Sequence, residues 1–192
     1  SAASDVYKRQ TLSSTQAGAA QVTAMLDSQQ SLDADHLINF NTDVVSADKS
    51  QLSLIPNTII SEIGRSQITL TLKDKYDNLL TGLKDKISVN YSTDLTATTT
   101  AFNEISTGVY QAQVSALKSG QTTISTKINS VTLTQTALLT VLPNNQTAKV
   151  DKFVISNAQP HAGDTITYHA YISDKNDNLV NSGVSVTWTT DK

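Results

Sequence analysis

Two short segments of the sequence carry residue types that could bind a metal ion. They read DKYDNLLTG at residues 74–82 and DKNDNLVNSG at residues 174–183, and both are rich in Asp and Asn. The second segment fits the beginning of a calcium-binding loop, in which alternate Asp and Asn side chains supply oxygen ligands. On this hypothesis the metal ligands would be Asp174, Asn176 and Asn178.

The simpler interpretation of both segments is a tight turn. The calcium pattern ends early, because Leu179 stands where such loops have glycine, and Tyr76 replaces the middle ligand of the first copy. Asp and Asn hydrogen-bond to their own backbone two residues on and tolerate left-handed backbone angles, as tight turns require. We therefore expect Asp74, Asn78 and their counterparts to be structural, and we expect no cofactor.

The two segments belong to a longer repeat with a period of roughly one hundred residues. Alternating segments precede both loops, at residues 66–73 and 164–173. After the glycines Gly82 and Gly183 comes another alternating segment, in which Tyr91 and Trp188 take matching places. A second match, between residues 17–26 and 119–128, aligns Gly18 with Gly120. A fixed period of this length is typical of tandem domains.

The repeat predicts one complete domain between two partial ones. We expect residues 11–46 to be the C-terminal part of a first domain, residues 47–143 a complete domain, and residues 144–192 the N-terminal half of a third. The polar segment LPNNQTAK at residues 142–149 has the composition of a linker. Residues 1–10 include DVYKRQ, which resembles a translated transposon end, and are expected to be an artefact outside the fold.

The alternation of apolar and polar residues predicts strands. In residues 68–72 it places Ile68, Leu70 and Leu72 on one face, and residues 87–91 likewise bring Ile87, Val89 and Tyr91 together. The same pattern is expected to bury Trp188 as a core anchor in the third copy. Several short strands in units of about one hundred residues predict an all-β fold of tandem immunoglobulin-like β-sandwich domains.

The composition excludes several functional classes. The net charge is −3 without a basic cluster, which argues against nucleic acid and against anionic membranes as partners. The chain has no cysteine and no apolar run long enough to insert into a membrane. Its three histidines lack the spacing of a metal pair, and no nucleophile or phosphate-loop motif occurs, so we predict that it is not an enzyme.

Four motifs in the expected order resemble the bacterial immunoglobulin-like (Big-1 type) repeats of invasin and intimin. They are S-x-L-x-L-x-P-x-x-I at residues 50–59, T-L-x-D-x-x-x-N at residues 71–78, Gly108–Val109–Tyr110, and the Ser119–Gly120 pair before a strand. Departures from the family are DN instead of GN at residues 77–78, Leu79 instead of proline, and SEIG instead of ADG at residues 61–64.

The resemblance implies a surface adhesin of the inverse-autotransporter type, which takes part in virulence. In such a protein an outer-membrane barrel anchors a rod of tandem domains at the bacterial cell surface, and distal domains bind a host receptor. Neither a barrel nor a distal module is recognisable in these residues, so the expected role is a non-enzymatic stalk whose partners are the neighbouring domains of the same chain. Two alternatives are a domain that itself binds a host protein or glycan, and an accessory module of a secreted bacterial glycosidase.

Overall fold

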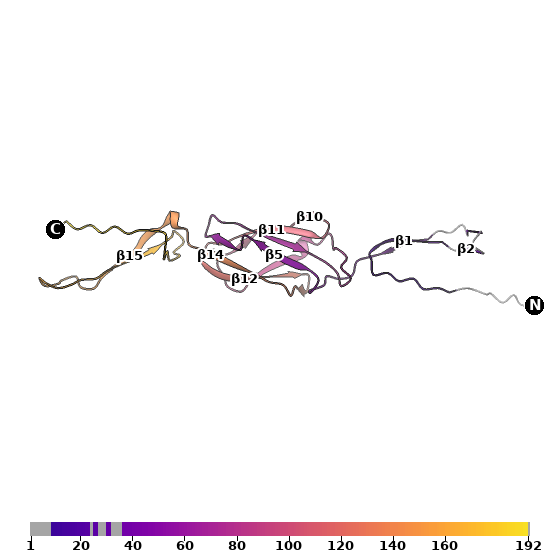
Figure 1. Ribbon diagram of the computed structural model, residues 1–192, viewed down its shortest axis with the longest axis horizontal. Helices are drawn as coiled ribbons and strands as arrows, with labels where there is room; N and C mark the ends of the chain where they lie inside the picture. The colour runs from indigo at the N-terminus through magenta and orange to yellow at the C-terminus, as the bar shows by residue number, and fades with distance from the viewer. Residues whose placement is uncertain (1–8, 24, 27–29, 32–35, 192) are drawn as a thin grey trace, which may run out of the picture.

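The computed structural model describes residues 9–23, 25–26, 30–31 and 36–191, and it is built from strands. Most of the segment expected to be an artefact, residues 1–8, lies outside the described residues. The described chain has three parts, which follow one another along a single axis with the largest part in the middle (Figure 1). We call residues 9–45 the N-terminal segment, residues 46–144 the central sandwich, and residues 145–191 the C-terminal segment.

The strands of the N-terminal segment are β1 (Gly18–Val22), β2 (Met25–Leu26), β3 (Gln30–Ser31) and β4 (His36–Phe40). The first half of the central sandwich contains β5 (Gln51–Ile55), β6 (Thr58–Ile60), β7 (Ser66–Thr71), the 3-10 turn η1 (Lys84–Lys86) and β8 (Ile87–Tyr91). The second half contains β9 (Thr98–Thr99), β10 (Asn103–Ser106), β11 (Val109–Ser115), β12 (Gly120–Ile128), β13 (Val131–Thr132) and β14 (Ala137–Leu142). The C-terminal segment contains the 3-10 turn η2 (Asn145–Thr147), β15 (Lys149–Ile155) and β16 (Tyr168–Ser173).

The central sandwich consists of two five-stranded sheets packed face to face. One sheet has the order β10-β11-β7-β5, with β9 also pairing with β11, and the other has the order β13-β12-β14-β6, with β8 also pairing with β12. The expected alternation is present, since Ile68, Leu70 and Leu72 are fully buried while Thr69 and Thr71 are half-buried. Burying such a side chain stabilises the fold by roughly 1.5–3 kcal/mol. The buried cluster runs from Leu52 to Val141, so the core lies within the central sandwich.

The first edge of the sandwich passes from one sheet to the other. β5 pairs antiparallel with β7, the chain turns at the cis Ile55–Pro56 peptide, and β6 then pairs with β14 of the opposite sheet. The pairing of β6 with β14 is parallel, with Thr140 opposite Thr58 and Leu142 opposite Ile60. The strand β6, which follows β5 along this edge, and the last strand β14 therefore lie side by side and run in the same direction.

The N-terminal segment repeats the geometry of β12 and β14. β1 pairs antiparallel with β4, and Gly18 lies opposite Phe40, just as Gly120 of β12 lies opposite Val141 of β14. The two glycines have nearly the same backbone angle φ, +143° for Gly18 and +140° for Gly120. Residues other than glycine rarely adopt this conformation. The sequence repeat is thus also a repeat of backbone geometry.

The C-terminal segment departs from one expectation. β15 and β16 pair antiparallel as β5 and β7 do, but residues 184–190 form no strand, and Trp188 is 51% exposed instead of buried. The corresponding strand β8 pairs only with β12, and the described C-terminal segment contains no counterpart of β12. The Trp188 ring packs instead against Phe153 and Tyr168, at 5.5 and 5.6 Å between ring centroids.

Candidate functional site at the two junctions

Each of the repeated Asp/Asn loops is a tight turn, and the side chain of its first aspartate stabilises the turn by hydrogen bonds to the backbone. Oδ1 of Asp74 accepts hydrogen bonds from the N–H groups of Tyr76 (2.8 Å) and Asn78 (2.9 Å). Asp77 takes up the left-handed backbone angle, with φ at 68°. Because Asp and Asn pay less for this conformation than most residues, the departure from the family's GN to DN leaves the turn intact.

The second loop has the same internal bonds. Oδ1 of Asp174 accepts from the N–H groups of Asn176 (2.8 Å) and Asn178 (3.0 Å), and Asp177 has a φ of 60°. In both loops the side-chain amide of the last asparagine also donates to Oδ2 of the aspartate. The distance is 2.9 Å from Asn78 to Asp74 and 2.8 Å from Asn178 to Asp174. The two loops therefore present their outward-facing groups in the same way.

The last asparagine of each loop, Asn78 or Asn178, binds the part of the chain that precedes the part containing the loop. Asn178 donates from Nδ2 to the carbonyl of Leu117 (2.8 Å), and its Oδ1 accepts from the N–H of Ser119 (2.7 Å). Leu117 and Ser119 lie just before Gly120, at the end of the central sandwich that contacts the C-terminal segment. One amide side chain thus bridges the second junction with both its donor and its acceptor.

Asn78 makes the same pair of bonds at the first junction. Its Nδ2 donates to the carbonyl of Thr15 (2.9 Å), and its Oδ1 accepts from the N–H of Ala17 (3.0 Å). Thr15 and Ala17 precede Gly18 just as Leu117 and Ser119 precede Gly120. Each loop is therefore a turn and also a joint to the preceding unit, which sequence reasoning did not predict.

The second oxygen of each aspartate holds the connecting segment in place. Oδ2 of Asp74 accepts from the N–H of Asp43 (3.0 Å), and Oδ2 of Asp174 accepts from the N–H of Asn144 (2.9 Å). Asp174 also accepts from the hydroxyl of Ser61 (2.8 Å), which belongs to the central sandwich. Ser61 lies between β6 and β7, and sequence reasoning noted it only as a departure from the family pattern.

Charged groups surround both junctions at the surface. The Lys75 ammonium pairs with Asp43 (2.8 Å) at the first junction, and Lys175 pairs with Glu62 at the second. Lys118 donates to the backbone carbonyl of Asn176 (2.6 Å). Exposed pairs of this kind contribute about 0–1 kcal/mol each, so the buried amide and carboxylate contacts dominate the junctions.

Both aspartates are ionised at neutral pH because of these donors. Burial of Asp74 raises its pKa, but the hydrogen bonds from the Asn78 amide and from the N–H groups of Asp43, Asn78 and Tyr76 outweigh it and lower the pKa to about 2. Burial likewise raises the pKa of Asp174. There the donors, led by the N–H of Asn144 and the Asn178 amide, lower it well below the usual range.

The same bonds bear on the calcium hypothesis. Both oxygens of Asp174, and Oδ1 of Asn178, already accept protein donors. Among the described residues, no three His, Cys, Asp or Glu side chains gather as a metal-binding group. Calcium at Asp174, Asn176 and Asn178 would have to displace hydrogen bonds that hold the junction, and it stays a prediction to be tested.

Three further predicted residues gather around one glutamate that sequence reasoning missed. The Glu104 carboxylate accepts from the N–H of Gly82 (2.9 Å) with one oxygen and from the N–H of Gly108 (3.1 Å) with the other. The fully buried Tyr110 donates its hydroxyl to the carbonyl of Leu80 (2.7 Å). The sequence offered one signal for Glu104, because glutamate occurs at only two positions in the chain.

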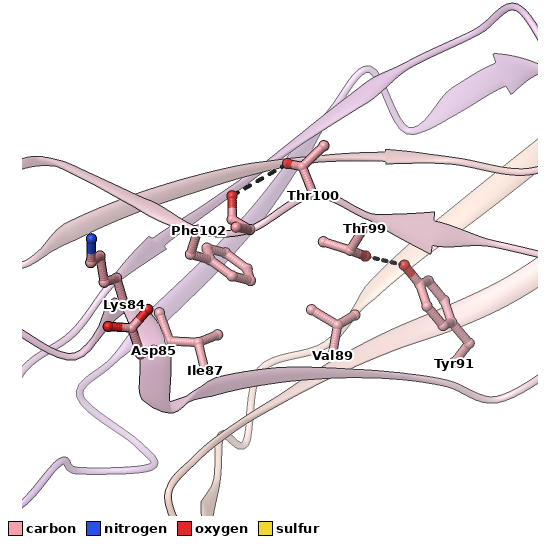
Figure 2. A pocket seen from close by; sticks show the side chains of 9 residues that line it. Lys84, Asp85, Ile87, Val89, Tyr91, Thr99, Thr100 and Phe102 are labelled. Carbon is pink, nitrogen blue, oxygen red and sulfur yellow. Dashed lines mark hydrogen bonds between the residues drawn. The ribbon is translucent and has the colours of Figure 1, made fainter.

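Tyr91 lies apart from this group, on the open side of the central sandwich. Figure 2 shows a hollow there, between β8 and the segment that carries β9, with Ile87, Val89 and Phe102 on its walls. The Tyr91 hydroxyl bonds to Thr99 across the hollow, and burial raises the pKa of Tyr91. The charged residues that line the hollow, Lys84 and Asp85, are exposed at one end (Figure 2), and the threonines Thr99 and Thr100 add polar groups, so the hollow presents both polar and apolar surface.

The two antiparallel-rich sheets packed face to face form a sandwich of the immunoglobulin-like kind. The family model "Invasin, domain 3" matches residues 46–144, which is more than half of the chain, so the chain belongs to this invasin domain family. Among the described residues, no helix is long and apolar enough to cross a membrane.

Two solved structures share the fold. The adhesin FdeC of Escherichia coli matches with a TM-score of 0.63 and 22% identity, over 87% of this chain and 54% of that one. InvD of Yersinia pseudotuberculosis matches with a TM-score of 0.60 and 19% identity, over 85% of this chain and 52% of that one. The chain thus spans about half the length of both structures. No curated protein matches the sequence.

Proposed function

We propose that these residues form a stalk segment of a bacterial surface adhesin, in which each domain is fixed to the domain before it. The observation that carries the proposal is the repeated joint, with Asn78 and Asn178 each binding two backbone groups of the preceding unit. A spacer has to transmit orientation and distance, and a hydrogen-bonded joint at every junction does both.

On this proposal the N-terminal and C-terminal segments are parts of further immunoglobulin-like domains, with boundaries near residues 46 and 144. The match of β1 and β4 to β12 and β14 supports this assignment, as does the match of β15 and β16 to β5 and β7. Domains arranged in this way contact only their neighbours, so the stability of a long array is a sum of local terms.

The proposal extends to the whole protein that would carry this stalk. Its anchor would be an outer-membrane barrel of the inverse-autotransporter type, its binding domains would lie distally and engage a host receptor, and the stalk itself would have no enzymatic activity. The family membership and the two adhesin structures support a place on the cell surface.

The test combines shape with binding. We expect small-angle X-ray scattering of the purified chain to show an elongated particle. We expect Asn178→Ala to shorten the maximum dimension or broaden the pair-distance distribution, because the second joint loosens. We also expect the fluorescently labelled chain to show no saturable binding to host cells or glycan arrays. Saturable binding by the chain itself would reject the spacer role in favour of a binding domain.

A further inference from the structure

The central sandwich has two different ends, and each takes part in one junction. The loop end carries residues 74–78, which contact the N-terminal segment. The receiving end carries the groups that contact residues 174–178 of the C-terminal segment: Ser61, Glu62, Leu117, Lys118 and Ser119. The two ends can therefore be compared within one domain.

The loop end has the buried groups that the receiving end binds. The receiving end binds the Asn178 amide and the Asp174 carboxylate. Asn78 and Asp74 occupy the same two places in the loop end. Among the described residues, no hydroxyl donates to Asp74 as that of Ser61 donates to Asp174. For every buried contact that the C-terminal segment makes at the second junction, the loop end therefore has the same chemical group.

The exposed contacts are matched as well. At the second junction Lys175 pairs with Glu62, and Lys118 donates to a backbone carbonyl at position 176. The loop end has Lys75 at the place of Lys175, and the carbonyl of Tyr76 needs no particular side chain. The first loop has Tyr76 where the second loop has Asn176, and this difference leaves a backbone carbonyl available to the Lys118 ammonium.

The backbone presents these groups alike in the two loops. The N–H of Asp74 donates to the carbonyl of Asn78 at 3.0 Å, and the corresponding bond from Asp174 to Asn178 measures 2.9 Å. The connecting segments also enter alike, because Asp43 and Asn144 donate their N–H groups to the same carboxylate oxygen of their loops. The two loops thus have the same internal donors and acceptors at nearly the same distances.

We propose that the central sandwich carries both halves of one joint, so that a second copy of this domain placed in tandem docks head to tail on the first through Asn78. This inference rests on the proposed spacer role, since it treats the junctions as joints. It means that the joint is a generic device of the repeat, and that domains of the array are interchangeable without redesign of their ends.

The experiment inserts a second copy of residues 43–143 after Pro143 of the full chain, which keeps the spacing of both connecting segments. The chain has no cysteine, so Ile105→Cys in each copy, at a position that is 55% exposed on β10, places one spin label per copy. Double electron–electron resonance then measures the distribution of distances between the copies. We expect one narrow distribution.

The decisive variants place the same substitution in different copies. Asn78→Ala in the downstream copy removes the bonds to Leu117 and Ser119 of the upstream copy, and we expect the narrow distribution to be lost. Asn78→Ala in the upstream copy faces the N-terminal segment instead, and we expect the narrow distribution to persist. Any folding defect caused by the substitution affects both variants equally, so their difference reports the joint.

A broad distribution in the unsubstituted double copy overturns the inference, as does an identical result for the two variants. The spacer role is tested separately in the native chain, with Ile105→Cys and the exposed Tyr171→Cys as label sites across the second junction. A narrow distribution there, together with a broad one between the copies, would reject interchangeable joints and leave the proposed stalk standing.

Discussion

Asn178 is a single side chain on which the second junction depends, and its replacement tests the joint directly. Asn178→Ala leaves the N–H of Ser119 and the carbonyl of Leu117 without their partner. Leaving a buried polar group unsatisfied costs about 1–3 kcal/mol. We therefore expect the amide of Ser119 to exchange its hydrogen roughly tenfold faster or more, as measured by hydrogen exchange with NMR detection.

Asn176→Ala is the matched control in the same loop. The side-chain nitrogen of Asn176 is buried and makes no hydrogen bond within the described residues, so its removal takes no bond from the junction. Its backbone carbonyl, which binds Lys118, remains. We expect Ser119 exchange to stay as in the unsubstituted chain, and equal acceleration in the two variants would contradict the role given to Asn178.

The carboxylate of Asp74 gives the first junction a dependence on pH. Its folded pKa of about 2 lies below the ordinary value of 3.8, so ionised Asp74 stabilises the fold above about pH 4. That contribution is lost as the pH falls from about 4 toward 2. We expect the free energy of unfolding, measured with urea at each pH, to fall in this window.

Asp74→Asn isolates this effect from neighbouring carboxylates. Asp43 and Asp77 also have lowered pKa values, the first through its hydrogen bond with Lys75 and the second through Lys49, so their protonation also lowers the stability of the fold as the pH falls. The variant removes only the Asp74 contribution, and its stability should therefore fall less steeply between pH 4 and 2. An unchanged slope would show that the junction does not depend on this carboxylate.

At the scale of the elements, Tyr110 connects β11 to the chain that follows the first loop. Its hydroxyl donates to the carbonyl of Leu80 and accepts from the N–H of Leu83, and the residue is fully buried. Tyr110→Phe removes both bonds while keeping the ring. We expect a loss of about 1–3 kcal/mol in the free energy of unfolding by urea.

Tyr76→Phe is the matched control for that measurement, because the Tyr76 side chain is 48% exposed. Water replaces whatever its hydroxyl contacts, and surface substitutions of this kind change stability by less than about 0.5 kcal/mol. Similar losses for the two variants would mean that the Tyr110 hydroxyl has no special structural role.

Strand faces could be predicted from the sequence because alternation is a local property. The burial of Ile68 and Leu70 beside half-exposed Thr69 follows directly from the period of two. The prediction that Trp188 is a core residue was wrong, because Trp188 is exposed. Alternation indicates which face of a strand a side chain lies on, whereas burial also needs a second sheet to cover that face. Tyr91 is half-buried because it packs against the core cluster of the central sandwich, which the C-terminal segment does not offer to Trp188.

The joint could not be predicted for a related reason. The sequence showed that Asp74 and Asn78 recur as Asp174 and Asn178, and turn chemistry accounts for the aspartates. The outward bonds of the asparagines depend on which backbone groups lie across the junction, and periodicity within a strand contains no information on the packing of domain ends. The recurrence of the asparagine at the fifth position of both loops was the available signal.

At the scale of the whole molecule, the junction contacts lead us to expect stability without calcium. Both oxygens of Asp174 already accept protein donors, so an ion would gain ligands only by breaking the joint. We expect the melting temperature of the chain, followed by circular dichroism, to be the same in calcium and in EDTA. A rise with calcium would mean that the folded state binds the ion, and the calcium loop hypothesis would be correct.

The parallel pairing of β6 with β14 determines how a stalk of such domains responds to pulling. Force applied through the two connecting segments enters the central sandwich before β5, which continues into β6, and leaves it after β14. Of these strands, β6 and β14 pair side by side in the same direction. The load therefore runs along the strands and is shared by all the hydrogen bonds between them, instead of opening them one after another. An adhesin held against flow would resist extension through this short ladder, which lies directly beside Ser61 and Asn144 of the second joint.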